Sequence, residues 1–320
     1  MNFEKGQFVS SLKSGDHVEG VFLITSCAQC VNNKGKPYLN IELQDCTGSA
    51  DAKKWDVFEG DLDILHSKKL AFIEGEANEY NGKVQIKIVK AAPIDASIEE
   101  MDNSLFAINA PVKKEDLVAR LNYFLDSFTN EDIKKMVNHL IEKNYKAYID
   151  YPAATRNHHN YVSGLLYHSL CMAKLAEKVA SQYKSLNKDL LIGGCLIHDI
   201  GKVKELSGPL ATEYTTEGRL LGHISIGQAE VRIAAKELGL EGTEIALLLE
   251  HMIISHHGQS DYGSPIAPET REALALSIID DFDAKMAMLD NVFSDMKPGE
   301  WSERLKTMDN RMFYLPKFDK

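Results

Sequence analysis

The sequence lacks the long apolar runs and the cysteine pairs that mark membrane-spanning and disulfide-stabilised proteins. No stretch approaches the roughly 20 apolar residues that a membrane helix needs, and the first 20 residues carry no apolar segment typical of a signal peptide. The five cysteines are an odd-numbered set scattered over 320 residues, which is typical of free thiols in a reducing compartment. We therefore expect a cytoplasmic protein, whose length suits two domains.

Basic residues are also scarce. The chain has 36 lysines and arginines against 47 aspartates and glutamates, which gives a formal net charge of −11. This balance argues against a broad cationic surface for non-specific nucleic-acid binding, because such binding relies on basic side chains that neutralise phosphates. It leaves room for a local positive groove, and a bound divalent metal would add charge that the sequence does not carry.

The first part of the chain has the pattern of a small β-barrel. Five short stretches with partial alternation are separated by turn signals, and Asn81-Gly82 between the last two is a strong hairpin signal. We predict a five-stranded barrel domain over residues 1–92, followed by a linker over residues 93–114. The predicted strands are residues 20–31, 38–45, 49–57, 70–80 and 83–92.

The pattern becomes helical after the linker. Apolar residues recur at spacings of three and four, so residues 115–296 are predicted to form an all-α domain. Residues 297–320 form a tail without an assignable pattern. The predicted helical segments are residues 117–128, 132–144, 162–183, 188–202, 223–239, 244–258 and 271–293.

Histidine clusters in the helical part, where eight of the eleven histidines fall between His158 and His257. His198-Asp199 ends an apolar run, and a buried imidazole beside a buried carboxylate is costly unless both are paired or metal-bound. One shared metal cluster would explain all of these polar groups, whereas the alternative requires separate partners for each. The other candidate ligands in apolar helical segments are His168, His223, His256, His257 and Asp280.

The donor types point to a transition metal. Imidazole and carboxylate together suit Mn, Fe, Co, Ni or Zn. Lys202, three residues after Asp199, could meet a phosphate oxygen; the alternative is a solvated lysine at a helix end. His251 lies five residues before His256 and faces a different side of the helix. Cys27 and Cys30 form a CxxC pair without a second pair, so we expect them to be structural.

The order of these residues resembles the HD superfamily of metal-dependent phosphohydrolases, and residues 198–202, HDIGK, closely match its core motif. The resemblance implies an all-α HD domain in which a first metal is held by His168, His198, Asp199 and Asp280. It implies that Asp199 bridges to a second ion held by His223 and His256, with His257 as a further candidate. Asp199 and Lys202 are then the candidate catalytic residues. Two metals can activate water and neutralise charge on a phosphodiester, although the number of ions is the weaker expectation.

The β domain resembles the OB-fold, a nucleic-acid-binding module. The likeness lies in Val21–Leu23, Tyr38-Leu39, Asp45, Thr47-Gly48 and residues 52–56. It implies an OB-type barrel that offers aromatic side chains for base stacking and lysines along the strand. For each aromatic residue the alternative is a place in the barrel core. The candidate substrate-binding residues here are Phe22, Tyr38, Lys53 and Trp55.

An OB-type barrel followed by an HD domain, in a chain of this length, resembles the YhaM family of 3′→5′ exoribonucleases. Residues 151–154 and the His158-His159 pair before the first metal histidine add to the likeness. The family implies hydrolysis of phosphodiester bonds from a free 3′ end of single-stranded RNA, with DNA as a further candidate, by a metal-activated water. Two Mn²⁺-like ions are implied. Arg156, His158 and His159 become candidate substrate contacts; the alternative is a loop that caps the helix.

Two other functions remain open at this point. An HD-type phosphohydrolase could act on a small or cyclic nucleotide, with the barrel used for regulation or assembly. A nucleic-acid-binding module could carry an inactive helical domain, although the intact ligand set disfavours this. An exonuclease also needs a closed end or a narrow channel, which assembly could supply, so a homo-oligomer is a further hypothesis.

Overall fold

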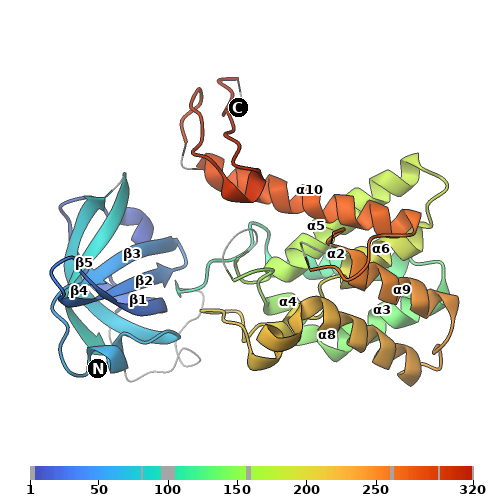
Figure 1. The fold of residues 1–320 in the computed structure, drawn as a ribbon, viewed down its shortest axis with the longest axis horizontal. Coiled ribbons are helices and arrows are strands. Elements are labelled where there is room, and N and C mark those ends of the chain that lie inside the picture. Colours follow the sequence, from blue (N-terminus) through green and yellow to red (C-terminus); the bar gives the residue numbers. More distant parts are fainter. Residues whose placement is uncertain are drawn as a thin grey trace. The chain divides into compact units, whose positions relative to one another are not determined.

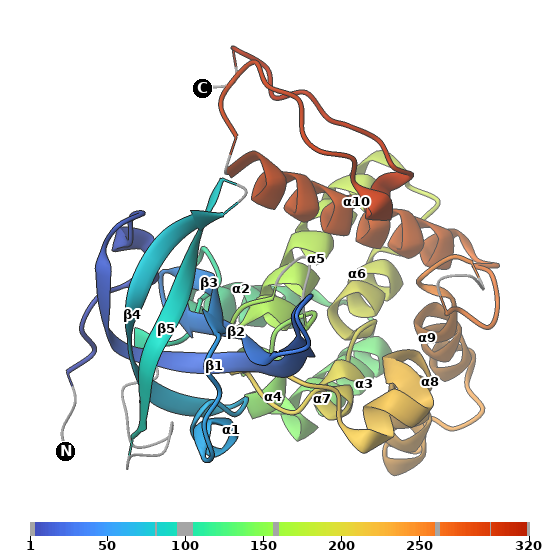
Figure 2. The ribbon, with the colours of Figure 1, turned by 60° about the vertical axis from the view of Figure 1, so that its left-hand side comes forward.

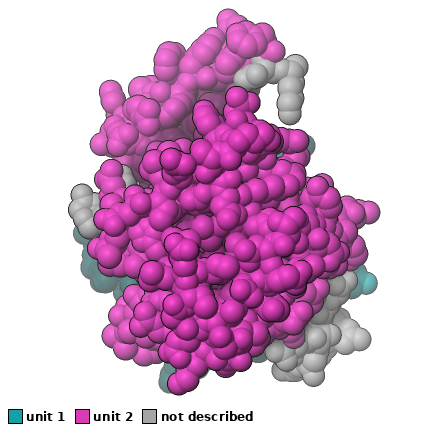
Figure 3. All heavy atoms as spheres, turned by 90° about the vertical axis from the view of Figure 1, so that its right-hand side faces the viewer, with its two compact units in different colours: residues 1–109, 208–212 teal, residues 110–207, 213–320 magenta. Residues whose placement is uncertain are grey.

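The computed structural model describes residues 4–80, 82–94, 105–155, 160–259, 263–294 and 296–318. It contains two compact units, coloured separately in Figure 3. Unit 1 comprises Met1–Asn109 together with Gly208–Thr212, and unit 2 comprises Ala110–Ser207 and Glu213–Lys320. The short segment in unit 1 is separated from the rest of that unit by almost 100 residues of chain, which no local pattern in the sequence indicated.

Unit 1 contains a closed five-stranded barrel with the strand order β1-β2-β3-β5-β4 (Figure 1). Neighbouring strands are antiparallel except for the parallel pair β3 and β5. The predicted OB-type five-stranded barrel is confirmed. Its strands are β1 (His17–Val31), β2 (Pro37–Asp45), β3 (Gly48–Lys54), β4 (Lys69–Tyr80) and β5 (Lys83–Pro93), with the short helices η1 (Val9–Ser11) and α1 (Asp61–Ile64).

Strand β1 is buried on both faces near its middle, which explains its unbroken apolar run. Phe22 and Ile24 point into the barrel core. Val21 and Leu23 point the other way, into a second apolar cluster that includes Phe106. Because Phe22 is fully buried, it is not available to stack on a base, which corrects its assignment as a substrate contact.

Unit 2 is helical, as predicted. Helix α6 lies at its centre and is buried from Asp189 to Ile197, as expected of a helix that is apolar all round. Glycines let neighbours approach it closely: a Cβ on Gly194 would lie 2.2 Å from Met252 Cε. The helices are α2 (Lys114–Ser127), α3 (Glu131–Lys143), α4 (Tyr145–Asp150), α5 (Gly164–Gln182), α6 (Lys188–Ile197), α7 (Lys202–Glu205), α8 (Thr216–Glu237), α9 (Glu244–Ser255) and α10 (Arg271–Ser294).

The tail after α10 forms an irregular hairpin with isolated bridges between Trp301 and Tyr314 and between Leu305 and Arg311. Its short helix η4 (Lys306–Met308) touches α10, since Thr307 Oγ1 lies 2.9 Å from Met288 Sδ (Figure 2). Among the described residues, no helix is both long enough and apolar enough to cross a membrane.

Gly201, between α6 and α7, fixes the position of α8. Its backbone is right-handed, with φ −63° and ψ −21°, so no left-handed turn requires a glycine here. A glycine is required by packing, because an added Cβ would lie 2.0 Å from the carbonyl oxygen of His223 and 2.7 Å from Gly227 N. This close approach of two backbones sets His223 beside the end of α6.

We expect Gly201→Ala to lower the free energy of unfolding by about 1–3 kcal/mol, because overpacking against a backbone forces it to move. Urea denaturation measures this loss. Gly193→Ala is the matched control, since its added Cβ would meet side chains and no backbone: methyl groups of Ile133 and Val137 at 3.2 Å and the Phe128 ring at 3.9 Å. An equal loss in both variants would contradict the role given to the Gly201 contact.

Candidate metal centre

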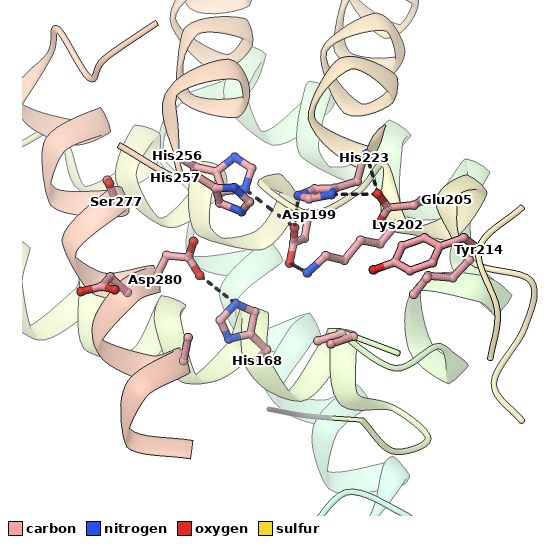
Figure 4. Close-up of a pocket in the computed structure, with 15 residues that line it drawn as sticks. His168, Asp199, Lys202, Glu205, Tyr214, His223, His256, His257, Ser277 and Asp280 are labelled. Carbon is pink, nitrogen blue, oxygen red and sulfur yellow. Dashed lines mark hydrogen bonds and ion pairs between the residues drawn. The ribbon is translucent and has the colours of Figure 1, made fainter. Parts of the chain in front are cut away.

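Unit 2 contains a pocket of about 400 Å³ whose wall is rich in histidine and carboxylate groups. Figure 4 shows these side chains converging, with the hydroxyl of Tyr214 pointing into the pocket. The pocket is lined by Ala153, Ala154, His168, Asp199, Lys202, Glu205, Leu206, Tyr214, His223, His256, His257, Ser277, Asp280, Asp281 and Ala284.

Helix ends bring most of the candidate ligands together. His198 is the C-terminal cap of α6, and Asp199 follows it. His256 is the C-terminal cap of α9, and His223 follows a break in α8 at Gly222, where φ is 72° and ψ is 153°. His168 on α5 and Asp280 on α10 come from within helices. The buried apolar faces of the helices thus place polar groups from five segments at one point.

The distances between ligand atoms are those expected around metal ions. His168 Nε2 lies 3.1 Å from Asp280 Oδ1, and His198 Nε2 lies 3.2 Å from Asp199 Oδ2. Asp199 Oδ1 lies 3.4 Å from His223 Nε2 and 3.8 Å from His256 Nε2. Two ligand atoms each about 2.1 Å from one ion are roughly 3–3.5 Å apart in a tetrahedral or octahedral shell, so the spacing fits with little movement.

Hydrogen bonds fix which ring nitrogen faces the centre. His198 Nδ1 pairs with the carbonyl oxygen of Cys195 at 2.9 Å, and His256 Nδ1 pairs with that of Ile253 at 2.6 Å. Since a carbonyl only accepts, each Nδ1 carries a proton, and the Nε2 of each neutral ring presents a lone pair inward. A metal-binding histidine is oriented in this way by the partner of its other nitrogen.

The central atoms are unsatisfied within the protein. Of seven buried side-chain atoms that lack a hydrogen-bond partner among the described residues, four meet here. Such groups are costly to bury without a partner, and a cation would satisfy them together. The donors therefore fit a divalent metal. The four atoms are His198 Nε2, Asp199 Oδ1, His223 Nε2 and His256 Nε2.

Three overlapping sets of residues could each hold an ion. Within each set, one ligand atom per residue lies within 4.8 Å of the others. The sets are His168, His198 and Asp280; His198, Asp199 and His256; and His223, His256 and His257. The structure thus brings all seven predicted metal ligands into one cluster.

The local electrostatics keep two of the ligands, Asp199 and His256, in the protonation states that metal binding needs. Burial alone would raise the pKa of the Asp199 carboxyl, but Lys202 and His198 hold it well below its ordinary value. The Lys202 ammonium lies 2.7 Å from Asp199 Oδ2. Burial and the neighbouring rings of His198 and His257 hold the pKa of His256 well below its ordinary value. Asp199 is therefore anionic and His256 neutral.

Three side chains at the pocket, two carboxylates and one tyrosine hydroxyl, were not predicted from the sequence. Glu205 contacts His223, Asp283 contacts His168, and Tyr214 lines the pocket. Asp283 follows Asp280 by three residues and so lies on the same side of α10, which is the one signal in the sequence that could have identified it. The predicted contacts Arg156, His158 and His159 lie outside the described residues.

The barrel carries a separate aromatic and cationic cluster. The rings of Tyr38 and Trp55 are stacked, with centroids 4.8 Å apart and planes at 28°. Lys53 Nζ lies 5.7 Å from the Tyr38 centroid and 5.5 Å from those of Trp55 and Tyr80. Trp55 is 41% exposed and Tyr80 is 60% exposed. We call these four residues the barrel cluster.

Comparisons with known proteins include a relative that matches nearly the whole chain. Residues 165–285 match the HD domain family. Over 304 residues, which are 95% of this chain and 94% of the relative, the sequence is 43% identical to the 3′-5′ exoribonuclease YhaM of Halalkalibacterium halodurans.

Two solved structures resemble single parts of the chain. The HD domain of the L. monocytogenes phosphodiesterase PgpH has a TM-score of 0.29 and 19% identity, and the match covers 51% of this chain and 88% of that one. The second OB-fold domain of replication protein A from Methanococcus maripaludis has a TM-score of 0.23 and 16% identity, and the match covers 29% of this chain and 97% of that one.

We expect Mn²⁺ to raise the unfolding temperature of the wild-type protein, because an ion bound only by the folded state stabilises it by about 2.7 kcal/mol at 100 times its Kd. Asp199→Asn keeps the side-chain shape but removes the central charge, so most of this rise should disappear. Thermal denaturation with and without a chelator measures the effect. Asp281→Asn is the control, since that carboxylate is 62% exposed and pairs with Lys285. A full rise in Asp199→Asn would exclude Asp199 as a ligand.

Proposed function

The chain belongs to the YhaM family of 3′-5′ exoribonucleases, and from this premise we propose that its metal centre hydrolyses phosphodiester bonds at the 3′ end of single-stranded RNA. The observation that carries the proposal is the group of four buried, unsatisfied atoms around Asp199. When bound there, divalent ions would polarise the phosphate and lower the pKa of a water molecule. We propose single-stranded RNA as the main substrate, and single-stranded DNA as a second one.

The charge of the centre favours two ions. Among the described residues, four carboxylates, those of Asp199, Glu205, Asp280 and Asp283, lie at the ligand cluster together with the ammonium of Lys202. With the histidines counted as neutral, the net formal charge of these five side chains is minus three. One divalent ion would leave the centre negative and repel a phosphodiester, whereas two would leave it positive and attract one. The donor set suits Mn²⁺, our first choice, and also Fe, Co, Ni or Zn.

The protein side chains would bind the ions and contact the phosphate. Asp199 faces ligand atoms of both proposed ions, so it would bridge them, with His257 as an additional ligand of the second. Lys202 is hydrogen-bonded to Asp199 and lines the pocket, so it would hold that carboxylate in place and offer a charge to a phosphate oxygen. In the proposed reaction, the oxygen of water adds to phosphorus, the P–O bond to the preceding nucleotide's 3′ oxygen breaks, and that oxygen takes up a proton. The products are the terminal nucleoside 5′-monophosphate and a shortened strand with a free 3′ hydroxyl.

The pocket volume supports cleavage from an end. A site of about 400 Å³ is at the lower end of the range for small-molecule pockets, roughly 300–1,000 Å³. It suits one terminal nucleotide better than a long stretch of strand. The same size also suits a mononucleotide or cyclic nucleotide, which is the observation in favour of the alternative substrate class.

We propose that the barrel holds the strand. In the barrel cluster, the exposed Trp55 and Tyr80 offer ring faces to bases, and Lys53 lies beside them. Stacking of this kind is tolerant of sequence and is worth about 1–3 kcal/mol per base. It needs no broad basic surface, which agrees with a chain whose net charge is −11.

We expect purified protein with Mn²⁺ to shorten 5′-labelled single-stranded RNA progressively from its 3′ end, while a 3′-phosphate-blocked strand is shortened more slowly. Denaturing gels of the time course provide the measurement. Asp199→Asn should abolish the ladder while retaining wild-type secondary structure by circular dichroism. Turnover of a cyclic or mononucleotide without any cleavage of RNA would instead support the alternative.

We expect Trp55→Ala to weaken binding of a long single strand by about 1–3 kcal/mol, which is roughly 5–150-fold in Kd. Cleavage of a dinucleotide should change little, because a dinucleotide has no bases beyond the two beside the scissile bond for the barrel to stack. Fluorescence anisotropy and the dinucleotide assay separate the two effects. Phe58→Ala is the matched control: Phe58 is 66% exposed on the same unit but outside the barrel cluster. Equal losses in the two variants would argue against the barrel cluster as the stacking site.

A further inference from the structure

The two outer histidines of the centre are held differently from the two inner ones. His198 and His256 are fixed by backbone carbonyl groups, so their orientation depends on the helices alone. His168 and His223 are fixed by carboxylate side chains, those of Asp283 and Glu205. We propose that Asp283 and Glu205 are positioning residues, each controlling the affinity of one metal subsite independently of the other. This inference rests on the proposed metal-dependent function.

Asp283 holds His168 from behind. Its Oδ2 lies 2.7 Å from His168 Nδ1, while Asp280 Oδ1 lies 3.1 Å from Nε2 on the other side of the ring. Asp280 and Asp283 are three residues apart on α10, and this spacing places both on one side of the helix. One turn of α10 therefore contacts both nitrogens of a ring that is almost completely buried. Without Asp283, Nδ1 would lose this carboxylate and the Asp280 contact would remain, so the orientation of the ring toward the first subsite would be less firmly fixed.

Glu205 holds both the backbone and the ring of His223. The break in α8 at Gly222 makes His223 the start of a new helical segment, whose first N–H groups have no carbonyl partner within the helix. Glu205 Oε1 accepts the N–H of His223 at 3.0 Å and lies 3.2 Å from its Nδ1. The same oxygen atom thus caps the helix and orients the ring, so the second subsite depends on this one contact.

The two positioning contacts do not share a residue. Asp283 and His168 lie on α10 and α5, whereas Glu205 and His223 lie on α7 and α8. Asp199, between the subsites, is held by Lys202. Because no side chain belongs to both contacts, loss of one should leave the other subsite in place. Removal of such a supporting partner typically lowers metal affinity by about 10–100-fold.

The test is a calorimetric titration of the metal-free full-length protein with Mn²⁺. Wild type should bind in two steps. Asp283→Ala should weaken one step by about 10–100-fold and Glu205→Ala the other. Asp283→Asn and Glu205→Gln keep an acceptor oxygen, so each should lose less affinity than its alanine counterpart. Asp281→Asn is the matched control for charge alone: it neighbours Asp280, but its carboxylate pairs with Lys285.

A second measurement separates this inference from the proposed function. In the metal-free protein labelled with ¹⁵N-histidine, wild type should show Nδ1–H protons on His168 and His223 that exchange slowly with solvent. Asp283→Ala should remove the first signal only, and Glu205→Ala the second only. If these losses occur but wild type binds no Mn²⁺, the metal function fails while the positioning holds.

Three results would overturn the inference. The first is two-step Mn²⁺ binding that neither alanine variant alters. The second is an equal weakening of both steps by each variant, because the subsites would then not be independent. The third is a loss in Asp281→Asn as large as in the alanine variants, since the effect would then reflect charge and not ring position.

Discussion

The Asp199 carboxylate is buried where the ends of several helices meet. One of its oxygens lies beside His198 and Lys202, and the other lies between the Nε2 atoms of His223 and His256 without a hydrogen bond. Lys202 offsets the charge at the first oxygen, but the second oxygen is costly to bury without a partner of its own. Divalent metal bound in the folded state would contribute its binding free energy to folding. This contribution explains why five chain segments converge on the carboxylate.

Helices and close backbone contacts in unit 2 hold the groups around Asp199 in position. The apolar helix α6 runs through the centre of unit 2 and delivers His198 and Asp199 at its end. Gly201 then lets the α8 backbone come close enough to bring in His223. Ring orientation comes from carbonyl groups for the inner histidines and from Glu205 and Asp283 for the outer ones. The protein's own backbone and side chains thus hold the ring orientations, which limits the reorganisation that binding requires.

Much of this organisation could be predicted from the sequence because it is local. Alternation and turn residues indicated the five strands. The position of histidines at and within apolar helical segments indicated a metal cluster, and the likeness to the HD superfamily indicated which residues are its ligands. Features that depend on distant packing could not be predicted. Phe22 lies in a strand buried on both faces, so its pattern does not reveal which residues face outward. Gly208–Thr212 belongs to the barrel unit although both flanks belong to unit 2. Glu205 looks like any charged helix residue until α8 is placed beside it.

The central claim is that Asp199 lies between two divalent ions. Anomalous diffraction at the manganese edge, from crystals of the full chain grown with Mn²⁺, tests it most directly. The account predicts two peaks within bonding distance of Asp199, one also next to His168 and Asp280 and the other also next to His223 and His256. A centre without any peak, or a single ion that Asp199 does not contact, would contradict it.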